Sequence, residues 1–366
     1  MLVQSEVARY LLLKGLITAE SIVDGNLQVV ESSRRNQNWK VINPGGTSYF
    51  LKQGIGSNKA ETVTHESTVY QLFSADPGKG CPGRHLPRFV SFDNDHRVLI
   101  LELLTEAKDF REYHTSGRFS TVFASELGRV LSEVHGAGEP RRDIPTESNF
   151  SARLPWVLGL HRPNLSLFRD ASNANLQLIR ILQNVEGFAQ TLDRLRQQWK
   201  VDGLIHNDIK WDNCLAVREP RSARKPEIKI VDWEFAGLGD RCWDVGAVLS
   251  NYLSFWLLSI PITGAEPPDR FVDLARYPLE SMQPALRAYW AAYVKGMELG
   301  DREAGEWLLR SVSYAGARLV QTGFEQMQFS TRLTGNLVCL LQLSLNIMQR
   351  PYEAAIQLLG IPGAAS

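Results

Sequence analysis

Two polar segments, each preceded by an apolar run, hold the residues of this chain that are best suited to chemistry. Residues 204–213 (LIHNDIKWDN) place Asp208 and Asn213 five positions apart in a polar loop. Residues 228–234 (IKIVDWE) have the pattern of a short buried strand that delivers the carboxylate of Asp232 at its end. The two segments therefore supply two carboxylates and one amide oxygen next to predicted strands.

These groups match the needs of phosphoryl transfer. The reaction develops charge on oxygen atoms, so the protein must supply magnesium ligands, cations and a carboxylate that receives the hydroxyl proton. Because Mg²⁺ prefers oxygen ligands and usually takes one or two from the protein, Asn213 and Asp232 fit as its ligands. Asp208 would orient the acceptor hydroxyl and accept its proton. His206 is expected to hold the loop together.

The first hundred residues predict a small α+β lobe that would position part of this chemistry. Helical periodicity covers 5–16, 18–23 and 61–73, and strand patterns cover 27–31, 38–42, 47–52, 88–92 and 98–101. Residues 43–46 (NPGG) predict a hairpin turn, because proline fixes φ and glycine permits positive φ.

The rest of the chain is predicted to be mainly helical. Apolar residues spaced by three and four over 120–135 indicate a helix with one buried face. Two short strands, 214–217 and 228–232, interrupt the helical pattern, which continues from Trp243 onward. We therefore predict domains at 1–103 and 104–366. The side chains of Asp208, Asn213 and Asp232 should converge on a magnesium–nucleotide complex in the cleft between them.

Composition narrows the class of protein. The 366 residues include 40 basic and 40 acidic side chains, so no overall field attracts nucleic acid or an anionic membrane. The four cysteines are far apart and form no CxxC pair, as expected for free thiols in a reducing compartment. The longest apolar stretch, 337–348, is too short and too polar for a membrane span and predicts a core helix. We expect a cytoplasmic protein without nucleic-acid or membrane partners.

The order of these motifs resembles that of the protein-kinase-like superfamily, and most of all its aminoglycoside phosphotransferase and choline kinase branch. That branch has H-G-D-x-x-x-x-N, then D-W-E, then G-D-x-x-x-D; this chain has residues 206–213, 232–234 and 239–244 (GDRCWD) in the same order. The resemblance implies a bilobal α+β fold, with a small antiparallel-sheet lobe and a larger helical lobe. It also implies ATP and Mg²⁺ as cofactors, and a structural role for Asp244 in bracing the catalytic loop.

The resemblance extends to the N-terminal lobe, which would bind the nucleotide. Lys52 closes the third strand and would grip the α- and β-phosphates, and Glu66 in the next helix would pair with it. Backbone groups of Glu102 and Leu104 would bond the adenine. The C-terminal lobe would hold the catalytic loop and the acceptor.

Two departures from the family pattern concern backbone positions. The turn at residues 32–37 (SSRRNQ) has no glycine, although a glycine-rich loop lets backbone amides approach phosphates closely. Ser33, or the side chains of Arg34 and Arg35, would have to take over those contacts. Asn207 replaces the glycine that usually precedes the catalytic aspartate.

The expected reaction is transfer of the γ-phosphate of ATP to a hydroxyl of a small molecule that is aminoglycoside-, choline- or sugar-like. Lys210 occupies a position that is typically lysine in serine/threonine protein kinases, so the resemblance implies that it would steady the transferred group. The same residue keeps open a Ser/Thr kinase acting on a peptide or protein, for example in modified-peptide maturation. A third alternative is a nucleotide-binding pseudokinase scaffold. An ATPase or autophosphorylation assay would discriminate that scaffold from an enzyme.

Overall fold

The computed structural model describes residues 2–32, 36–74, 82–137, 150–152, 154–217, 226–261 and 272–362. The chain forms two compact units, and each contains two stretches of sequence. Unit 1 comprises 1–110 and 212–236, and unit 2 comprises 111–211 and 237–366. The short strands that follow residues 204–213 thus belong with the N-terminal stretch, whereas the sequence assigned them to the C-terminal lobe. The boundary at residue 103 stays a prediction.

Unit 1 is built on a five-stranded antiparallel sheet in the order β1-β2-β3-β5-β4. Its elements are α1 (Gln4–Leu13), α2 (Ala19–Val23), β1 (Gln28–Glu31), β2 (Gln37–Ile42), β3 (Tyr49–Gln53), α3 (Ser57–Ser74), β4 (Phe89–Asp93), β5 (Val98–Glu102), β6 (Lys108–Asp109), β8 (Cys214–Val217) and β9 (Glu227–Ile230). Strand β8 pairs with both β6 and β9 in a separate small sheet.

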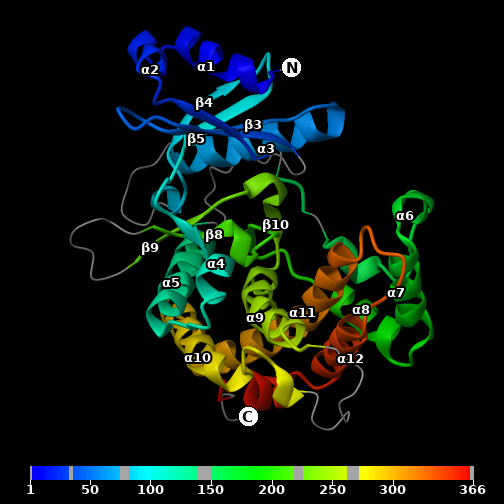
Figure 1. Cartoon of the computed structure of the whole chain (residues 1–366). Helices are drawn as coiled ribbons and strands as arrows, with labels where there is room; N and C mark the ends of the chain where they lie inside the picture. Colours follow the sequence, from blue (N-terminus) through cyan, green and yellow to red (C-terminus); the bar gives the residue numbers. More distant parts are fainter. Residues whose placement is uncertain are drawn as a thin grey trace. The chain divides into compact units, whose positions relative to one another are not determined.

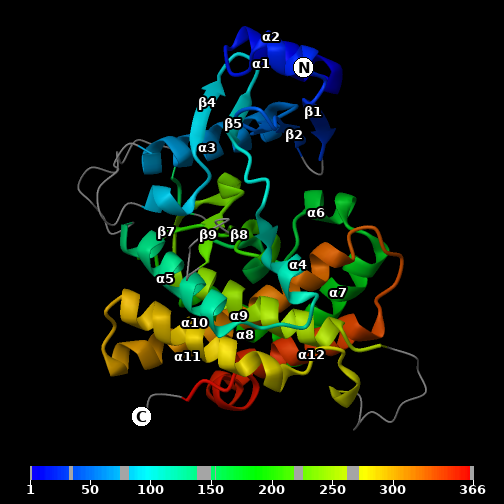
Figure 2. The same cartoon turned by 60° about the vertical axis from the view of Figure 1, so that its left-hand side comes forward.

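Helices cover both faces of the large sheet, as Figures 1 and 2 show for α1 and α3. Side chains alternate between the two faces along a strand. On β3, Leu51 therefore joins the apolar core under α1, together with Ile100 of β5. The next residue, Lys52, points to the opposite face, where α3 lies and where Glu66 meets it. Strand alternation thus buries a lysine beside a helix without placing it in the apolar core.

Unit 2 consists mainly of helices. They are α4 (Phe110–His114), α5 (Thr121–Ala137), α6 (Leu165–Asp170), α7 (Asn173–Asn184), α8 (Phe188–Gln197), α9 (Arg241–Leu258), α10 (Leu279–Gly296), α11 (Asp301–Gln326), α12 (Gly335–Gln349) and α13 (Pro351–Glu353). Strands β7 (Gly203–Ile205) and β10 (Gly237–Gly239) pair in a two-stranded antiparallel ladder. Along the chain they lie before and after residues 212–236, the second stretch of unit 1.

Glycines allow the central helices of unit 2 to pack closely (Figure 2). A Cβ atom on Gly246 of α9 would lie 2.5 Å from the carbonyl oxygen of Ser311 on α11. A Cβ atom on Gly128 of α5 would lie 2.3 Å from the carbonyl oxygen of Tyr289 on α10. Both distances are below any real contact, so only glycine permits these helix pairs their present separation.

Most predicted elements are present, and the α+β class is confirmed. The hairpin turn forms at 43–46, where the amide of Gly46 donates to the carbonyl of Asn43 at 3.1 Å. The strand predicted over 228–232 is wrong at its end, because β9 stops at Ile230 and Asp232 has a left-handed backbone with φ of 68°. The helix predicted from Glu61 begins earlier, at Ser57.

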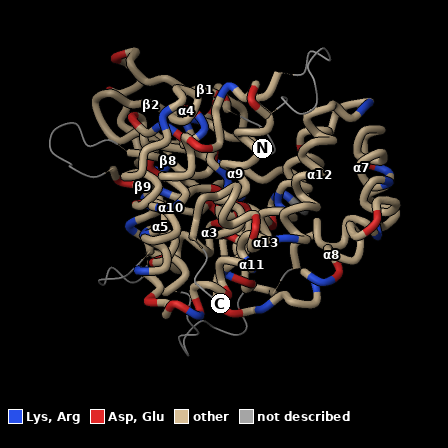
Figure 3. The backbone as a smooth tube through the Cα atoms, turned by 90° about the horizontal axis from the view of Figure 1, so that it is seen from below, with Lys and Arg blue, Asp and Glu red and all other residues tan. Residues whose placement is uncertain are grey.

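The distribution of charged residues along the chain agrees with the equal numbers of basic and acidic side chains in the sequence. Figure 3 shows Lys and Arg interspersed with Asp and Glu along the tube rather than gathered in long runs of one sign. Residues 337–348 lie in α12, whose inward side chains are buried. Throughout the described ranges, none of the helices is both long enough and apolar enough to span a lipid bilayer.

Candidate active site

A buried lysine surrounded by three carboxylates is the most concentrated group of charges in unit 1. The Nζ atom of Lys52 lies 2.7 Å from Glu66, 2.5 Å from Asp232 and 3.2 Å from Glu234. Lys52, Glu66 and Glu234 are each at most 5% exposed. The predicted pair of Lys52 and Glu66 therefore forms, and the same ammonium also reaches the carboxylate predicted to bind Mg²⁺.

The cluster has three carboxylates and one ammonium, and the pKa values of both Lys52 and Glu66 depart from their ordinary values. Burial alone would lower the pKa of Lys52, but the carboxylates of Glu66, Asp232 and Glu234 together raise it above its ordinary value. Burial raises the pKa of Glu66 to about 7, in spite of the opposing charge of Lys52. One ammonium faces three carboxylates, and the raised pKa of Glu66 reflects this excess of acidic groups, so the cluster is suited to accept a further cation.

Asn213 and Asp232 lie at the same end of the β8–β9 ladder. Asn213 immediately precedes β8, Asp232 follows β9 by two residues, and the strands are antiparallel with Cys214 opposite Ile230. The amide of Val231 donates to the carbonyl of Asn213 at 3.0 Å. The positive φ of Asp232 costs conformational energy for a residue with a side chain, which is common where a functional group is held in a set direction.

Two residues that sequence reasoning did not assign belong to this cluster. Glu234, the last residue of the Asp-Trp-Glu motif, contacts Lys52 and accepts a hydrogen bond from Nδ2 of Asn36 at 3.0 Å. Asn36 ends the turn without glycine and is 4% exposed, and its buried Oδ1 has no hydrogen-bond partner among the described residues. The motif pointed to Glu234, but no local pattern links Asn36 to a residue 198 positions away.

The oxygen donors of unit 1 are compatible with a hard divalent cation. Carboxylate oxygens of Glu66, Asp232 and Glu234 lie within 4.8 Å of one another. The unpartnered Oδ1 of Asn36 adds a neutral oxygen close to Glu234. Donors of this kind suit Mg²⁺. Asp232 is common to this group and to the predicted ligand pair with Asn213.

The predicted base, Asp208, lies in a loop of unit 2 whose backbone is held on several sides. Asn207 has a φ of 68°, which explains why glycine is usual at this position and why asparagine, which tolerates the left-handed region, can replace it. The ring Nδ1 of His206 accepts a hydrogen bond from the amide of Asp208 at 3.2 Å. His206 is fully buried, as expected for a residue that shapes the loop.

Asp244 at the start of α9 braces this loop from behind, as the resemblance implied. Its carboxylate accepts the amide of His206 at 2.6 Å and the amide of Asn207 at 2.9 Å, and Nε2 of His135 lies 3.3 Å away. Burial alone would raise the pKa of Asp244, but His135 and the hydrogen bond from the amide of His206 hold it below its ordinary value.

Cations flank the carboxylate of Asp208 itself. Nζ of Lys210 donates to its Oδ2 at 2.8 Å, and a guanidinium nitrogen of Arg318 lies 3.6 Å from its Oδ1. Lys210 was predicted from sequence. Arg318 was not, because it lies on α11, far along the chain, and no motif includes it.

The remaining predicted residues are less informative. Ser33 lies outside the described residues. The amide of Glu102 donates to the carbonyl of Arg88 at 3.0 Å, and the carbonyl of Leu104 accepts the amide of Ala107 at 3.2 Å. The adenine contacts expected of Glu102 and Leu104 stay predictions.

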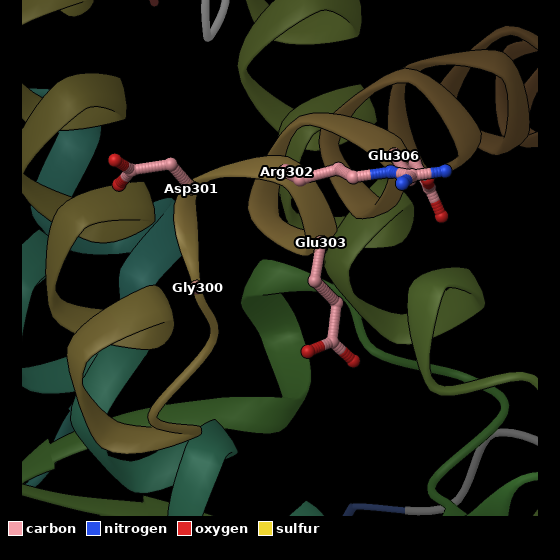
Figure 4. A pocket seen from close by; sticks show the side chains of 5 residues that line it. All are labelled: Gly300, Asp301, Arg302, Glu303 and Glu306. Carbon is pink, nitrogen blue, oxygen red and sulfur yellow. The ribbon is translucent and has the colours of Figure 1, made fainter.

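A shallow surface hollow at the start of α11 involves none of these residues. Figure 4 shows Arg302 extended toward Glu306, with Asp301 directed away from them, and the side chains of Asp301, Arg302 and Glu303 are all exposed. Arg302 and Glu306 form an ordinary surface ion pair at 3.2 Å. This hollow therefore gives no evidence of a ligand site.

Comparison with solved structures agrees with the fold. The chain is 13% identical to choline kinase from Cryptosporidium parvum Iowa II, with 96% of each chain covered and a TM-score of 0.55. It is 16% identical to a putative fructosamine-3-kinase from Thermobifida fusca, with 95% of this chain and 99% of that chain covered and a TM-score of 0.54. Amicoumacin kinase hAmiN, solved with AMP-PNP, Ca²⁺ and Ami, is 14% identical over 93% of this chain and 95% of that chain, with a TM-score of 0.52. At this level of identity the likeness establishes the kinase-like fold.

The family itself is identified from sequence. No curated protein matches the chain. The model of the phosphotransferase enzyme family matches residues 26–310, a range that contains the Lys52 cluster of unit 1 and the Asp208 loop of unit 2. The chain therefore belongs to the phosphotransferase enzyme family and is an enzyme of the kinase type.

Proposed function

We propose that this enzyme transfers the γ-phosphate of ATP to a hydroxyl group of a small molecule. The observation that carries the proposal is the contact of Lys52 with both Glu66 and Asp232 inside the range matched by the family model. A buried ammonium held by a helix carboxylate and by the residue predicted to bind Mg²⁺ is suited to bind nucleotide phosphates.

Each residue has a defined part in the proposed reaction. Asp208 orients the acceptor hydroxyl and takes its proton while the hydroxyl oxygen attacks the γ-phosphorus, and the bond to the β-phosphate oxygen breaks to release ADP. Lys52 holds the nucleotide phosphates and is itself positioned by Glu66. Asn213 and Asp232 would hold Mg²⁺, which neutralises charge on the phosphate oxygens when bound. Lys210 contacts Asp208 and is available to the transferred group.

Loss of the base or of the metal ligand tests this proposal. Asp208→Ala should lower turnover by about 10²–10⁴-fold, the usual contribution of a general base, and leave the fold intact. Asp232→Ala should have an effect at least as large and should also weaken nucleotide binding, since it contacts Lys52. Asp273→Ala, an exposed position, is the control. Wild-type turnover in Asp208→Ala would show that another group is the base.

A peptide or protein acceptor is the second candidate. The observation that favours it is the ion pair of Lys210 with Asp208, at a position where lysine is typical of serine/threonine protein kinases. Radiolabelled ATP with Mg²⁺, offered aminoglycosides, amino alcohols and sugars in one series and Ser/Thr peptides in another, separates the two. Transfer to peptides alone would replace the small-molecule proposal, and binding of ATP without any transfer would indicate a scaffold. The expectation of a cytoplasmic enzyme stays a prediction.

A further inference from the structure

The cation opposite Lys210 at the predicted base comes from a helix distant in sequence. Lys210 contacts Oδ2 of Asp208 at 2.8 Å, while a guanidinium nitrogen of Arg318 lies 3.6 Å from Oδ1. The two carboxylate oxygens thus face different cations. Asp208 is 6% exposed, so water screens these charges less than it would at the surface.

Arg318 is itself fixed in place. It is 5% exposed, one of its terminal nitrogens donates to Oε1 of Gln321 at 3.0 Å, and the other donates to the carbonyl of Ile209 at 3.2 Å. Its guanidinium also lies 5.5 Å from the ring centre of Trp243. The nitrogen that binds the carbonyl of Ile209 is the same one that faces Asp208. A single planar group therefore holds both the backbone and the carboxylate of the loop.

Burying the guanidinium of Arg318 costs free energy, and a residue whose only role was to fill space would not need a charge. Nε of Arg318 is buried and has no hydrogen-bond partner within the described part of the chain. Removing a guanidinium from water carries a penalty that a neutral side chain of similar length would avoid. The contacts that offset this penalty are those to the Asp208 loop, which indicates that the charge serves the loop.

We infer that Arg318 is a positioning residue for Asp208: it orients the carboxylate that acts as the base. The inference rests on the proposed function, in which Asp208 accepts the hydroxyl proton. The other titratable groups of unit 2 at this loop are His206, whose ring accepts the amide of Asp208, and Asp244, which binds the loop backbone from α9. Neither replaces a cation beside the carboxylate.

Replacement of the charge separates this role from a structural one. Arg318→Met keeps a long side chain but removes the guanidinium that faces Oδ1 of Asp208 and binds the carbonyl of Ile209. Misplacement of the base should lower kcat at pH 7 by about 100-fold, with little change in the KM for ATP. Arg318→Lys keeps the charge and loses the planar fork, so its kcat should fall between those of wild type and Arg318→Met.

The assay needs no knowledge of the acceptor. Slow hydrolysis of Mg·ATP, with water in place of the acceptor hydroxyl, provides the rate. Arg302→Met on the same helix α11 is the matched control, because the side chain of Arg302 is 94% exposed. Its kcat and its KM for ATP should both be unchanged. Gln321→Leu removes the hydrogen bond to Arg318 and leaves its charge, so it serves if Arg318→Met does not fold. It should lower kcat with little change in the KM for ATP, and a wild-type kcat in Gln321→Leu would count against the inference.

A spectroscopic measurement gives a readout that does not depend on turnover. In protein labelled with ¹³C at the aspartate carboxyl carbon, the resonance of Asp208 is assigned by its absence in Asp208→Asn, and its chemical shift is compared at one pH in wild type, Arg318→Met, Arg318→Lys and Arg302→Met. A displaced resonance and a lower kcat in Arg318→Met, both partly restored in Arg318→Lys, support the inference. A wild-type resonance and a wild-type kcat in Arg318→Met, with only a lower melting temperature, would overturn it. If Asp208→Asn keeps wild-type turnover, the proposed function fails instead.

Discussion

Removal of the Asp244 carboxylate is the perturbation whose size follows most directly from the structure. Asp244 is fully buried and accepts the amides of His206 and Asn207, at 2.6 Å and 2.9 Å. Nε2 of His135 approaches the same carboxylate at 3.3 Å. Asp244→Ala therefore leaves the buried amide of His206, the partly buried amide of Asn207 and the buried imidazole of His135 without this partner.

The cost can be estimated from these contacts. A buried donor left without a partner costs about 1–3 kcal/mol, so the two amides alone predict a loss of about 2–6 kcal/mol. Water that enters the space left by the side chain would reduce this figure. Asp244→Asn keeps one acceptor oxygen and presents an NH₂ group toward the other amide, so we expect roughly half the loss.

Two measurements check this prediction. Urea unfolding gives the loss of stability, and hydrogen–deuterium exchange of residues 203–211 reports whether the loop loosens locally. Exposed Asp273 is the control position, and Asp273→Ala should leave both unchanged. If Asp244→Ala unfolds at the wild-type urea concentration and residues 203–211 exchange at the wild-type rate, the bracing role assigned to Asp244 is wrong.

Two further predictions concern stability. Gly246→Ala should destabilise the protein by roughly 1–3 kcal/mol, because its Cβ would lie 2.5 Å from the carbonyl oxygen of Ser311. Gly136→Ala on helix α5 is the control, since its Cβ would enter open space and the change should be neutral or stabilising. Equal melting temperatures for the two variants would contradict the close packing of α9 on α11. Burial alone would raise the pKa of Asp93, but hydrogen bonds from Lys14, the amide of His96 and Tyr10 lower it below its ordinary 3.8. The stability that Asp93 contributes should therefore be present above pH 3.8 and be lost as the pH falls through its lower folded-state pKa. The difference in unfolding free energy between wild type and Asp93→Asn should then shrink in acid. A difference that grows in acid would refute the assignment.

Local patterns in the sequence were sufficient to predict most helices and strands and to identify the residues that lie within motifs. Periodicity and turn residues predicted the hairpin at 43–46 and the helix over 120–135, because these depend on neighbours along the chain. The order of motifs also indicated that Lys52 and Glu66 pair. Backbone conformation was harder, and the strand predicted to reach Asp232 stops two residues earlier because that residue adopts positive φ.

The sequence by itself determined which side chains are candidates for this chemistry: a predicted base, predicted oxygen ligands and a lysine predicted to bind phosphates, in an order that indicates the phosphotransferase family. Tertiary structure alone decided which groups surround them. Asn36 meets Glu234 across 198 residues, and Arg318 meets the carbonyl of Ile209 across 109. Neither contact leaves a local pattern, because a side chain buried beside a distant partner is placed by the packing of whole helices and strands.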